Sequence, residues 1–241
     1  AYQFPISADL NKNLKQILVG MQKAADHNAR LLIFPECALT GYPGKDLESP
    51  SQIDFSAEEA ALVELAGYST ALDLAIVFGM VERKGGAFFN SAMLAVPCKP
   101  IRVIYRKRAL WGWDIDNFQP GNEADGTVEI EGFRFGVRIC FEVRFPEYFR
   151  ELFRRRTDCN LMLFFDRSDP DSTERYDLIT AHLRTRAVEN VTATLSVNTC
   201  SNYQTAPTAA IDEDGVIRAE LRRHEQGLLL YELERKSALS F

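Results

Sequence analysis

Several segments of this 241-residue sequence are apolar at every position, and they constrain the fold more than any other feature. Residues 31–34, 74–78 and 161–165 are of this kind. A strand with this composition is buried on both faces, so helices or a second sheet must cover it. Segments with helical spacing of apolar residues, such as 10–28 and 174–189, alternate with these strands. The pattern predicts a layered α/β protein and leaves the number of sheets open.

Capping and turn signals divide the rest of the chain. The pair Ser56 and Glu59 predicts a capping box that opens a helix running to Leu72. Gly85-Gly86 predicts a hairpin and Asp214-Gly215 a later turn. Asp9 is the expected cap of the first helix. Further strands are expected at 91–96, 101–106, 133–139, 193–197 and 227–233, and a further helix at 146–156. No linker-like stretch interrupts the sequence, which predicts one domain over residues 1–241.

Charge and cysteine usage exclude several classes of protein. The net charge of -6 argues against a nucleic-acid partner, which needs a basic face. No apolar run approaches the roughly 20 residues of a membrane helix, so no membrane partner is expected. The five cysteines are scattered without a C-x-x-C pair. This predicts reduced thiols in a cytoplasmic protein rather than a disulfide framework or a metal site.

Three reactive side chains each follow a predicted strand. Glu36 comes after the strand 31–34, Lys107 after 101–106, and Cys140 after 133–139. Open α/β sheets bind ligands at the carboxyl ends of their strands. The sequence therefore predicts that a carboxylate, an ammonium group and a thiol converge at one site.

This combination of groups indicates nucleophilic catalysis by cysteine. A free thiol is mostly protonated near neutral pH; a nearby ammonium group such as Lys107 favours the thiolate, and Glu36 is placed to accept the proton. A sharp turn between the strand and the helix expected after Pro146 would point the backbone N–H of Phe141 at a developing oxyanion. None of the three histidines follows a strand, so a carboxylate base is favoured over a histidine.

The same residues resemble the motifs of a known family. Residues 140–147, Cys-Phe-Glu-Val-Arg-Phe-Pro-Glu, resemble the nucleophile motif of the carbon–nitrogen hydrolase (nitrilase) superfamily. Residues 34–36, continued by 40–43, resemble its base motif, and 105–107 resemble its lysine motif. Residues 118–121 and 186–190 are similar to its later segments. The motifs occur in the family's order, and the similarity runs over nearly the whole chain.

The resemblance implies a four-layer α-β-β-α sandwich, paired into a homodimer or a larger homo-oligomer. It also implies hydrolysis of a small linear amide or carbamoyl compound, in which Cys140 forms a thioester and ammonia leaves. Glu36 is then the base, and Lys107 with the backbone N–H of Phe141 stabilises the tetrahedral intermediate. No metal and no organic cofactor is implied.

The sequence departs from the family pattern at three places. Many relatives carry a second glutamate after the lysine; here Asp116 stands nearest that position and Asp114 is its rival, with a loop-capping role as the alternative. Trp111 is expected to form a wall of the pocket or to pack without a functional role. Arg167 is expected either to bind a substrate carboxylate through its planar fork, or to pair with Asp166 or Asp169.

Other functions compete with amide hydrolysis. True nitrilases commonly have tryptophan after the cysteine, whereas Phe141 is smaller and favours an amide. A non-catalytic binding member of the fold would not require Cys140, Glu36 and Lys107 together. Acyl transfer to an amine or alcohol would use the same thioester. Glu142 and Arg144, beside the nucleophile, are expected to hold the turn.

Overall fold

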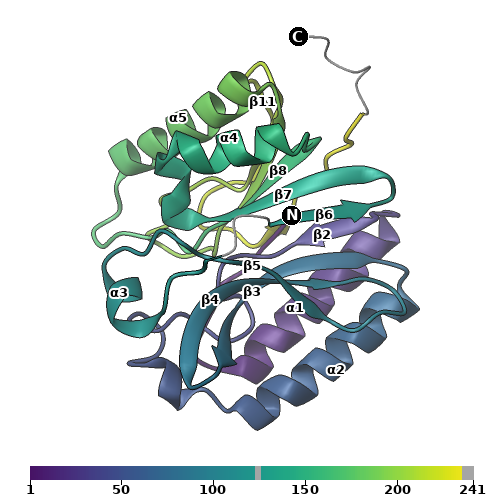
Figure 1. Cartoon of the computed structure of the whole chain (residues 1–241), viewed down its shortest axis with the longest axis vertical. Helices are drawn as coiled ribbons and strands as arrows, with labels where there is room; N and C mark the ends of the chain where they lie inside the picture. The colour runs from purple at the N-terminus through teal and green to yellow at the C-terminus, as the bar shows by residue number, and fades with distance from the viewer. Residues whose placement is uncertain (123–125, 235–241) are drawn as a thin grey trace.

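The computed structural model describes residues 1–122 and 126–234, and these form four layers in the order helices, sheet, sheet, helices (Figure 1). A four-stranded sheet has the order β2-β3-β4-β5, and a six-stranded sheet has the order β11-β10-β9-β8-β7-β6. Helices α1 and α2 cover the outer face of the first sheet, and α4 and α5 that of the second. The predicted α-β-β-α sandwich is confirmed.

The elements of the first half have these bounds: β1 Tyr2–Gln3, α1 Leu10–Asp26, β2 Leu31–Ile33, α2 Phe55–Ala71, β3 Ala75–Lys84, β4 Ala87–Ala95, β5 Arg102–Arg106 and α3 Trp113–Asn117. Those of the second half are β6 Thr127–Ile130, β7 Phe133–Ile139, the 3₁₀ turn η2 Cys140–Arg144, α4 Pro146–Arg154, β8 Cys159–Leu163, α5 Thr173–Asn190, β9 Ala193–Val197, β10 Ala209–Ile211, β11 Ile217–Glu220 and β12 Gly227–Leu228. Strands β1 and β12 pair with each other.

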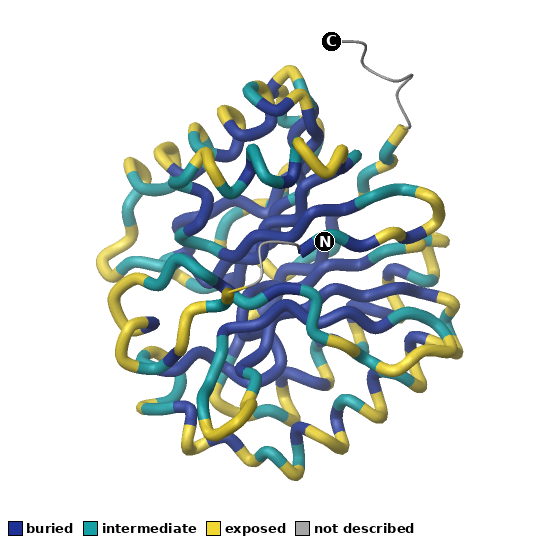
Figure 2. The backbone as a smooth tube through the Cα atoms, in the orientation of Figure 1, coloured by how far each residue is buried: buried dark blue, intermediate teal, exposed yellow. Residues whose placement is uncertain are grey.

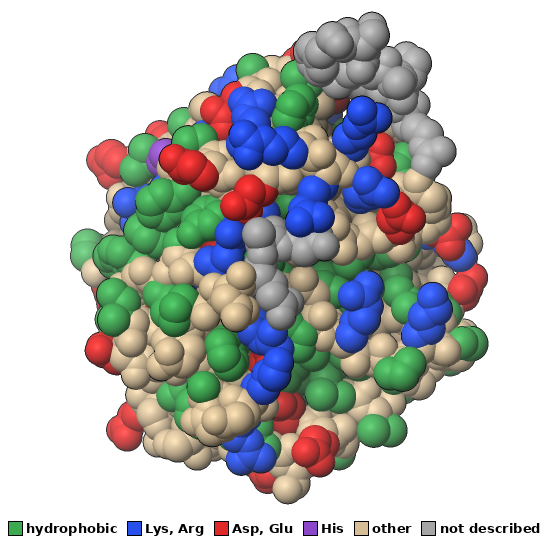
Figure 3. All heavy atoms as spheres, in the orientation of Figure 1, with side chains coloured by type: hydrophobic (Ala, Val, Ile, Leu, Met, Phe, Trp, Pro, Cys, Tyr) green, Lys and Arg blue, Asp and Glu red, His purple; other side chains and the backbone are tan. Residues whose placement is uncertain are grey.

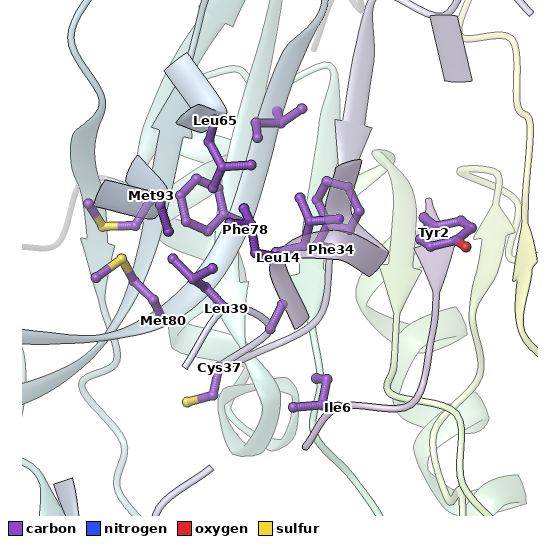
Figure 4. Close-up of a cluster of buried hydrophobic side chains, with 14 of the residues drawn as sticks. Tyr2, Ile6, Leu14, Phe34, Cys37, Leu39, Leu65, Phe78, Met80 and Met93 are labelled. Carbon is purple, nitrogen blue, oxygen red and sulfur yellow. The ribbon is translucent and has the colours of Figure 1, made fainter. Parts of the chain in front are cut away.

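The apolar strands are buried on both faces, as predicted. Along β3, Ile76 and Phe78 pack against the helices, whereas Val77 packs against the second sheet. Figure 4 shows Phe78 beside Leu65 of α2 and Leu14 of α1. Fully burying a side chain of this size contributes about 1.5–3 kcal/mol. The buried backbone in Figure 2 accordingly lies in the two sheets, and the exposed positions lie on the outer sides of the helices.

Local signals predicted several element boundaries correctly. The Asp9 side chain accepts the N–H of Lys12 at 3.1 Å and caps α1. Strands β3 and β4 form the hairpin expected at Gly85-Gly86, whose φ values of 58° and 80° suit glycine. Gly215, with φ of 76°, makes the predicted turn after Asp212.

The capping box was placed wrongly. Helix α2 begins at Phe55, and its cap is Asp54, whose carboxylate accepts the N–H groups of Ser56 and Ala57 at 3.0 and 3.1 Å. Ser56 therefore lies inside the helix, because the aspartate two residues earlier already satisfies the free N–H groups of the first turn. Other elements differ from the prediction as well: β12 ends at Leu228, and β6, β10, β11 and α3 were not predicted.

The surface view in Figure 3 shows Lys and Arg side chains lying among acidic and apolar ones on one face. Among the described residues, no helix is both long and apolar enough to cross a membrane.

Gly79 of β3 is required where this strand passes the turn that carries Glu36. A Cβ atom at Gly79 would lie 2.4 Å from the backbone N of Cys37 and 2.6 Å from Cα of Glu36. We expect Gly79→Ala to lower the free energy of unfolding by about 1–3 kcal/mol, because the backbone must move. Gly67→Ala is the control: nothing lies within 4 Å of its Cβ on α2, and about 0.5–1 kcal/mol of stabilisation is expected. Thermal denaturation measures both, and equal stability of the two variants would contradict the expectation.

Candidate active site

Cys140 lies at the end of β7, where the chain turns sharply into η2. Its φ of 47° is in the left-handed region, which is uncommon for a residue with a Cβ. Strained backbone of this kind occurs at functional sites, where the surroundings hold it in place. Helix α4 then begins at Pro146, so the predicted strand–turn–helix arrangement around the thiol is confirmed.

Glu142 fastens this turn to the neighbouring sheet. Its carboxylate accepts the backbone N–H groups of Ile139 and Arg108, both at 2.8 Å, and the hydroxyl of Tyr105 at 2.7 Å. The prediction that Glu142 holds the turn is confirmed. Arg144, by contrast, lines the cleft in front of Cys140.

Glu36 follows β2 and is fully buried. One carboxylate oxygen accepts hydrogen bonds from Lys107 Nζ at 2.8 Å and from Asn90 Nδ2 at 2.7 Å. The other accepts the backbone N–H of Phe165 at 2.8 Å. Burial raises the pKa of Glu36 above its usual value, although the Lys107 ammonium group acts in the opposite direction. These three hydrogen bonds fix the direction in which the carboxylate of Glu36 points.

Lys107 follows β5 and is equally buried. Its Nζ lies 2.8 Å from Glu36 Oε1 and 2.6 Å from Asp114 Oδ2. Burial alone would lower the pKa of Lys107, but the carboxylates of Glu36 and Asp114 hold it well above its ordinary value. Lys107 is therefore a fixed positive charge and not a proton acceptor.

The second carboxylate at Lys107 is Asp114, and the prediction that favoured Asp116 is wrong. Asp114 is 1% exposed on α3 and also accepts the hydroxyl of Tyr42, whereas Asp116 is exposed to solvent. The two positions are two residues apart on a single helical turn, so they lie on different faces of it. Asp114 is the rival that the sequence left open.

The surroundings of the Cys140 thiol raise its pKa, which favours the protonated form at rest. Cys140 is partly exposed at the cleft, while protein surrounds it on its other sides. Burial first, and then the negative charge of Glu36, raise the pKa of Cys140 well above its ordinary value, although Lys107 lowers it. The sequence predicted correctly that Lys107 favours the thiolate, but this effect is outweighed. The thiol must therefore lose its proton during the reaction.

The cleft in front of Cys140 has a volume of about 70 Å³. Sites for drug-sized ligands occupy about 300–1,000 Å³, so this cleft fits a small molecule. Its walls are formed by Tyr42, Lys45, Lys107, Trp111, Trp113, Asp114, Phe141, Val143, Arg144, Phe165, Asp166, Arg167, Arg175 and Ile179. A wider and more open hollow of about 490 Å³ lies beside Arg134 and Arg154, away from these residues.

The structure also places the remaining predicted residues. Trp111 is 55% exposed and lies 6.1 Å from the ring of Phe141, so it lines the cleft. Arg167 lines the cleft as well, but it pairs with neither Asp166 nor Asp169. Its ion-pair partner is Asp46 at 3.9 Å, because Arg175 occupies Asp166 through two hydrogen bonds of 2.8 and 2.7 Å.

Sequence reasoning missed Asn90 and the role of Tyr42. Asn90 donates to Glu36, and its backbone oxygen accepts the N–H of Lys107 at 2.9 Å. An asparagine inside the mostly apolar strand β4 was the available signal. Tyr42 stood in the motif that resembles the family's base segment, but nothing in the sequence showed that its hydroxyl reaches Asp114.

A thiol, a carboxylate and an ammonium group at one cleft of a four-layer α-β-β-α sandwich are the arrangement of a cysteine-dependent hydrolase. The model of the carbon-nitrogen hydrolase family matches residues 1–240. The chain therefore belongs to the carbon–nitrogen hydrolase family, as its motifs predicted. Within the described residues, no group of three or more His, Cys, Asp or Glu side chains is arranged to bind a metal.

Curated relatives include two amidases. An (R)-stereoselective amidase from a Pseudomonas species is 33% identical over 144 residues, which cover 60% of this chain and 51% of the relative. A 2-oxoglutaramate amidase from Bacillus subtilis is 28% identical over 239 residues, covering 96% of this chain and 88% of the relative. This chain spans only about half the length of the Pseudomonas amidase and of some other relatives that it matches.

Solved structures of an amidase from a Nesterenkonia species share the fold. One has a TM-score of 0.82 and 23% identity, and the match covers 93% of this chain and 85% of the other. A mutant of this amidase in complex with butyramide has a TM-score of 0.81 and 25% identity, with 94% and 86% covered. A further mutant shows the result of Michael addition of acrylamide at the active site cysteine.

Proposed function

We propose that this chain hydrolyses a non-peptide C–N bond of a small linear amide or carbamoyl compound and releases ammonia. The observation that carries the proposal is the meeting of Glu36 and Lys107, from the ends of two strands of one sheet, with Cys140, from the end of a strand of the other. The relatives that are amidases, and the small volume of the cleft, support the substrate class.

Acylation is the first half of the proposed reaction. The sulfur of Cys140 attacks the amide carbon while Glu36 takes the thiol proton. The carbonyl oxygen becomes an oxyanion, which the Lys107 ammonium group and the backbone N–H of Phe141 stabilise. The C–N bond then breaks, Glu36 passes its proton to the nitrogen, and ammonia leaves a thioester on Cys140.

Deacylation repeats these steps with water. Glu36 takes a proton from the water molecule as its oxygen attacks the thioester carbon. The C–S bond breaks, the sulfur regains a proton from Glu36, and the carboxylic acid leaves. One water molecule is consumed for each amide, and the enzyme returns to its starting state.

The experiment that tests the proposal is intact-protein mass spectrometry with a panel of small amides, carbamoyl compounds and nitriles, together with an assay for released ammonia. We expect an acyl adduct on Cys140 and ammonia from at least one amide. Turnover of nitriles alone would identify a nitrilase, and product formation that depends on an added amine or alcohol would identify acyl transfer. Neither adduct nor ammonia across the panel would favour a non-catalytic binding protein.

Asp114 is expected to contribute to this reaction and Asp116 is not. We expect Asp114→Asn to lower kcat/KM by about 10- to 100-fold, because it removes a charge-assisted hydrogen bond to Lys107. The matched control is Asp116→Asn on the same helical turn, which should stay within about twofold of the wild type because Asp116 is exposed. Steady-state ammonia release measures both variants. The same loss in both, or in neither, would contradict the assignment of Asp114.

Four statements stay predictions from the sequence. They are the homodimer or larger homo-oligomer, the cytoplasmic location, the absence of nucleic-acid partners, and the single domain over residues 1–241. Residues 123–125 and 235–241 of that domain lie outside the described residues.

A further inference from the structure

The cleft holds more positive charges than the proposed chemistry uses. Lys45, Arg144, Arg167 and Arg175 line it together with Lys107. Two of these five cations are neutralised within hydrogen-bonding distance. Lys107 contacts Glu36 and Asp114, and Arg175 holds the carboxylate of Asp166 with both arms of its fork. The other three have no such partner among the residues that the structure describes.

The guanidinium N–H groups of Arg167 make no hydrogen bond to the described part of the chain. Its guanidinium group carries five N–H donors, and none of them makes a hydrogen bond within residues 1–122 and 126–234. The Asp46 oxygen at 3.9 Å is beyond hydrogen-bonding distance. Asp46 is instead engaged with its own turn, where it accepts the N–H of Tyr42 at 3.0 Å. The side chain of Arg167 is 33% exposed, so a ligand in the cleft can reach it.

Lys45 brings a second positive charge to the same part of the cleft. Its Nζ lies 3.6 Å from the centre of the Trp113 ring, a cation–π contact that fixes the side chain in place. Burial and then the positive charge of Arg167 lower the pKa of Lys45, whereas Asp169 and Asp46 raise it. The two like charges repel each other, and an anion bound by both would remove the repulsion.

Resting on the proposed amide hydrolysis, we propose that the substrate carries a carboxylate remote from the amide, and that Arg167 and Lys45 bind this carboxylate. A guanidinium fork matches the two oxygens of a carboxylate, and the ammonium group of Lys45 adds a donor without fixed direction. The cleft is also lined by apolar side chains, among them Phe165 and Ile179, which suit the carbon chain of such a substrate. With a cleft of about 70 Å³, the substrate class is the monoamide of a short aliphatic dicarboxylic acid.

Arg144 lines the same cleft and is the competing candidate for this carboxylate. Its guanidinium group lies 5.3 Å from the centre of the Phe141 ring, on the nucleophile's own turn. The cation beside it, Arg186, donates to its backbone oxygen at 3.2 Å and is already paired with Glu189. Lys45, beside Arg167, has no ion-pair partner among the described residues. The inference therefore assigns the carboxylate to Arg167 and Lys45, and a comparison of variants separates the two sites.

The test compares the monoamide of glutaric acid with pentanamide, which has the same carbon chain without the carboxylate. For the wild type, we expect kcat/KM to favour the monoamide by about 10-fold or more. Arg167→Met and Lys45→Met should each remove most of this preference, so that the two amides approach equal kcat/KM. Lys12→Met is the matched control, because it removes one positive charge from an exposed side chain of α1 outside the cleft, and it should keep the preference.

A measurement on the wild type makes the test independent of how the variants fold. Glutarate should inhibit pentanamide hydrolysis competitively, and its inhibition should weaken as salt is added. Arg167→Lys should retain part of the preference, since it keeps the charge and loses the fork. Equal kcat/KM for both amides, or loss of the preference in Arg144→Met but not in Arg167→Met, would overturn the inference while amide hydrolysis stands. Failure to hydrolyse any amide would overturn the proposed function instead.

Discussion

Replacing Cys140 with alanine is expected to abolish amide hydrolysis, with kcat falling by about 10⁴- to 10⁶-fold. Among the described residues that line the cleft, Cys140 is the only thiol. Glu36 and Asp114 are both engaged with Lys107, whose pKa is held well above its ordinary value. The fold should survive, because Cys140 is partly exposed and alanine adopts its backbone conformation at the same cost. Ammonia release measures the loss, and thermal denaturation checks the fold.

Cys98→Ala is the matched control for this variant. Cys98 is also a cysteine in the left-handed region, with φ of 60°, but it is exposed and lies outside the cleft. We expect it to retain wild-type hydrolysis and to lose only its own alkylation by iodoacetamide. Wild-type turnover in Cys140→Ala would exclude the thioester mechanism, whatever the control shows.

The three central residues of the site were predictable because each follows a strongly apolar strand. Strand β2 runs parallel to β3, and two antiparallel steps, from β3 to β4 and from β4 to β5, return β5 to the same direction. Glu36 and Lys107 therefore follow the carboxyl ends of β2 and β5, which lie at the same end of the four-stranded sheet. Cys140 leaves the parallel strand β7 of the other sheet, and the two sheets pack face to face.

The remaining parts of the site depend on packing that no local pattern encodes. Whether Asp114 or Asp116 reaches Lys107 depends on the orientation of a single helical turn. This turn follows Gly112, whose φ is 56°. The protonated state of Cys140 follows from burial, which a sequence does not display. The short strands β10 and β11 contain three and four residues, too few for a periodic pattern to separate them from loops.

Replacing Glu36 with glutamine is expected to lower kcat by about 10²- to 10⁴-fold, the usual contribution of a general base. The loss should be large because the raised pKa of Cys140 favours the protonated thiol, whose proton Glu36 must accept. In the wild type, burial raises the pKa of Glu36, so kcat/KM should fall with acid at a pH above the usual range for a glutamate. The direction of this pH dependence follows from the role of Glu36 as a base. A base is inactive once it is protonated, and a raised pKa means that Glu36 becomes protonated at a higher pH. The pH profile of the variant should lack this acidic limb.

Glu58→Gln is the control that separates the role of a base from the burial of a carboxylate. Glu58 is 6% exposed in α2, outside the cleft, and burial raises its pKa to about 8. A carboxyl group with this pKa is mostly neutral at pH 7, so glutamine mimics the form already present, and both stability and activity should change little. An equal loss of kcat in Glu36→Gln and Glu58→Gln would attribute the effect to the packing of the fold. Loss in Glu36→Gln alone, together with loss of the acidic limb, requires that this carboxylate moves the proton.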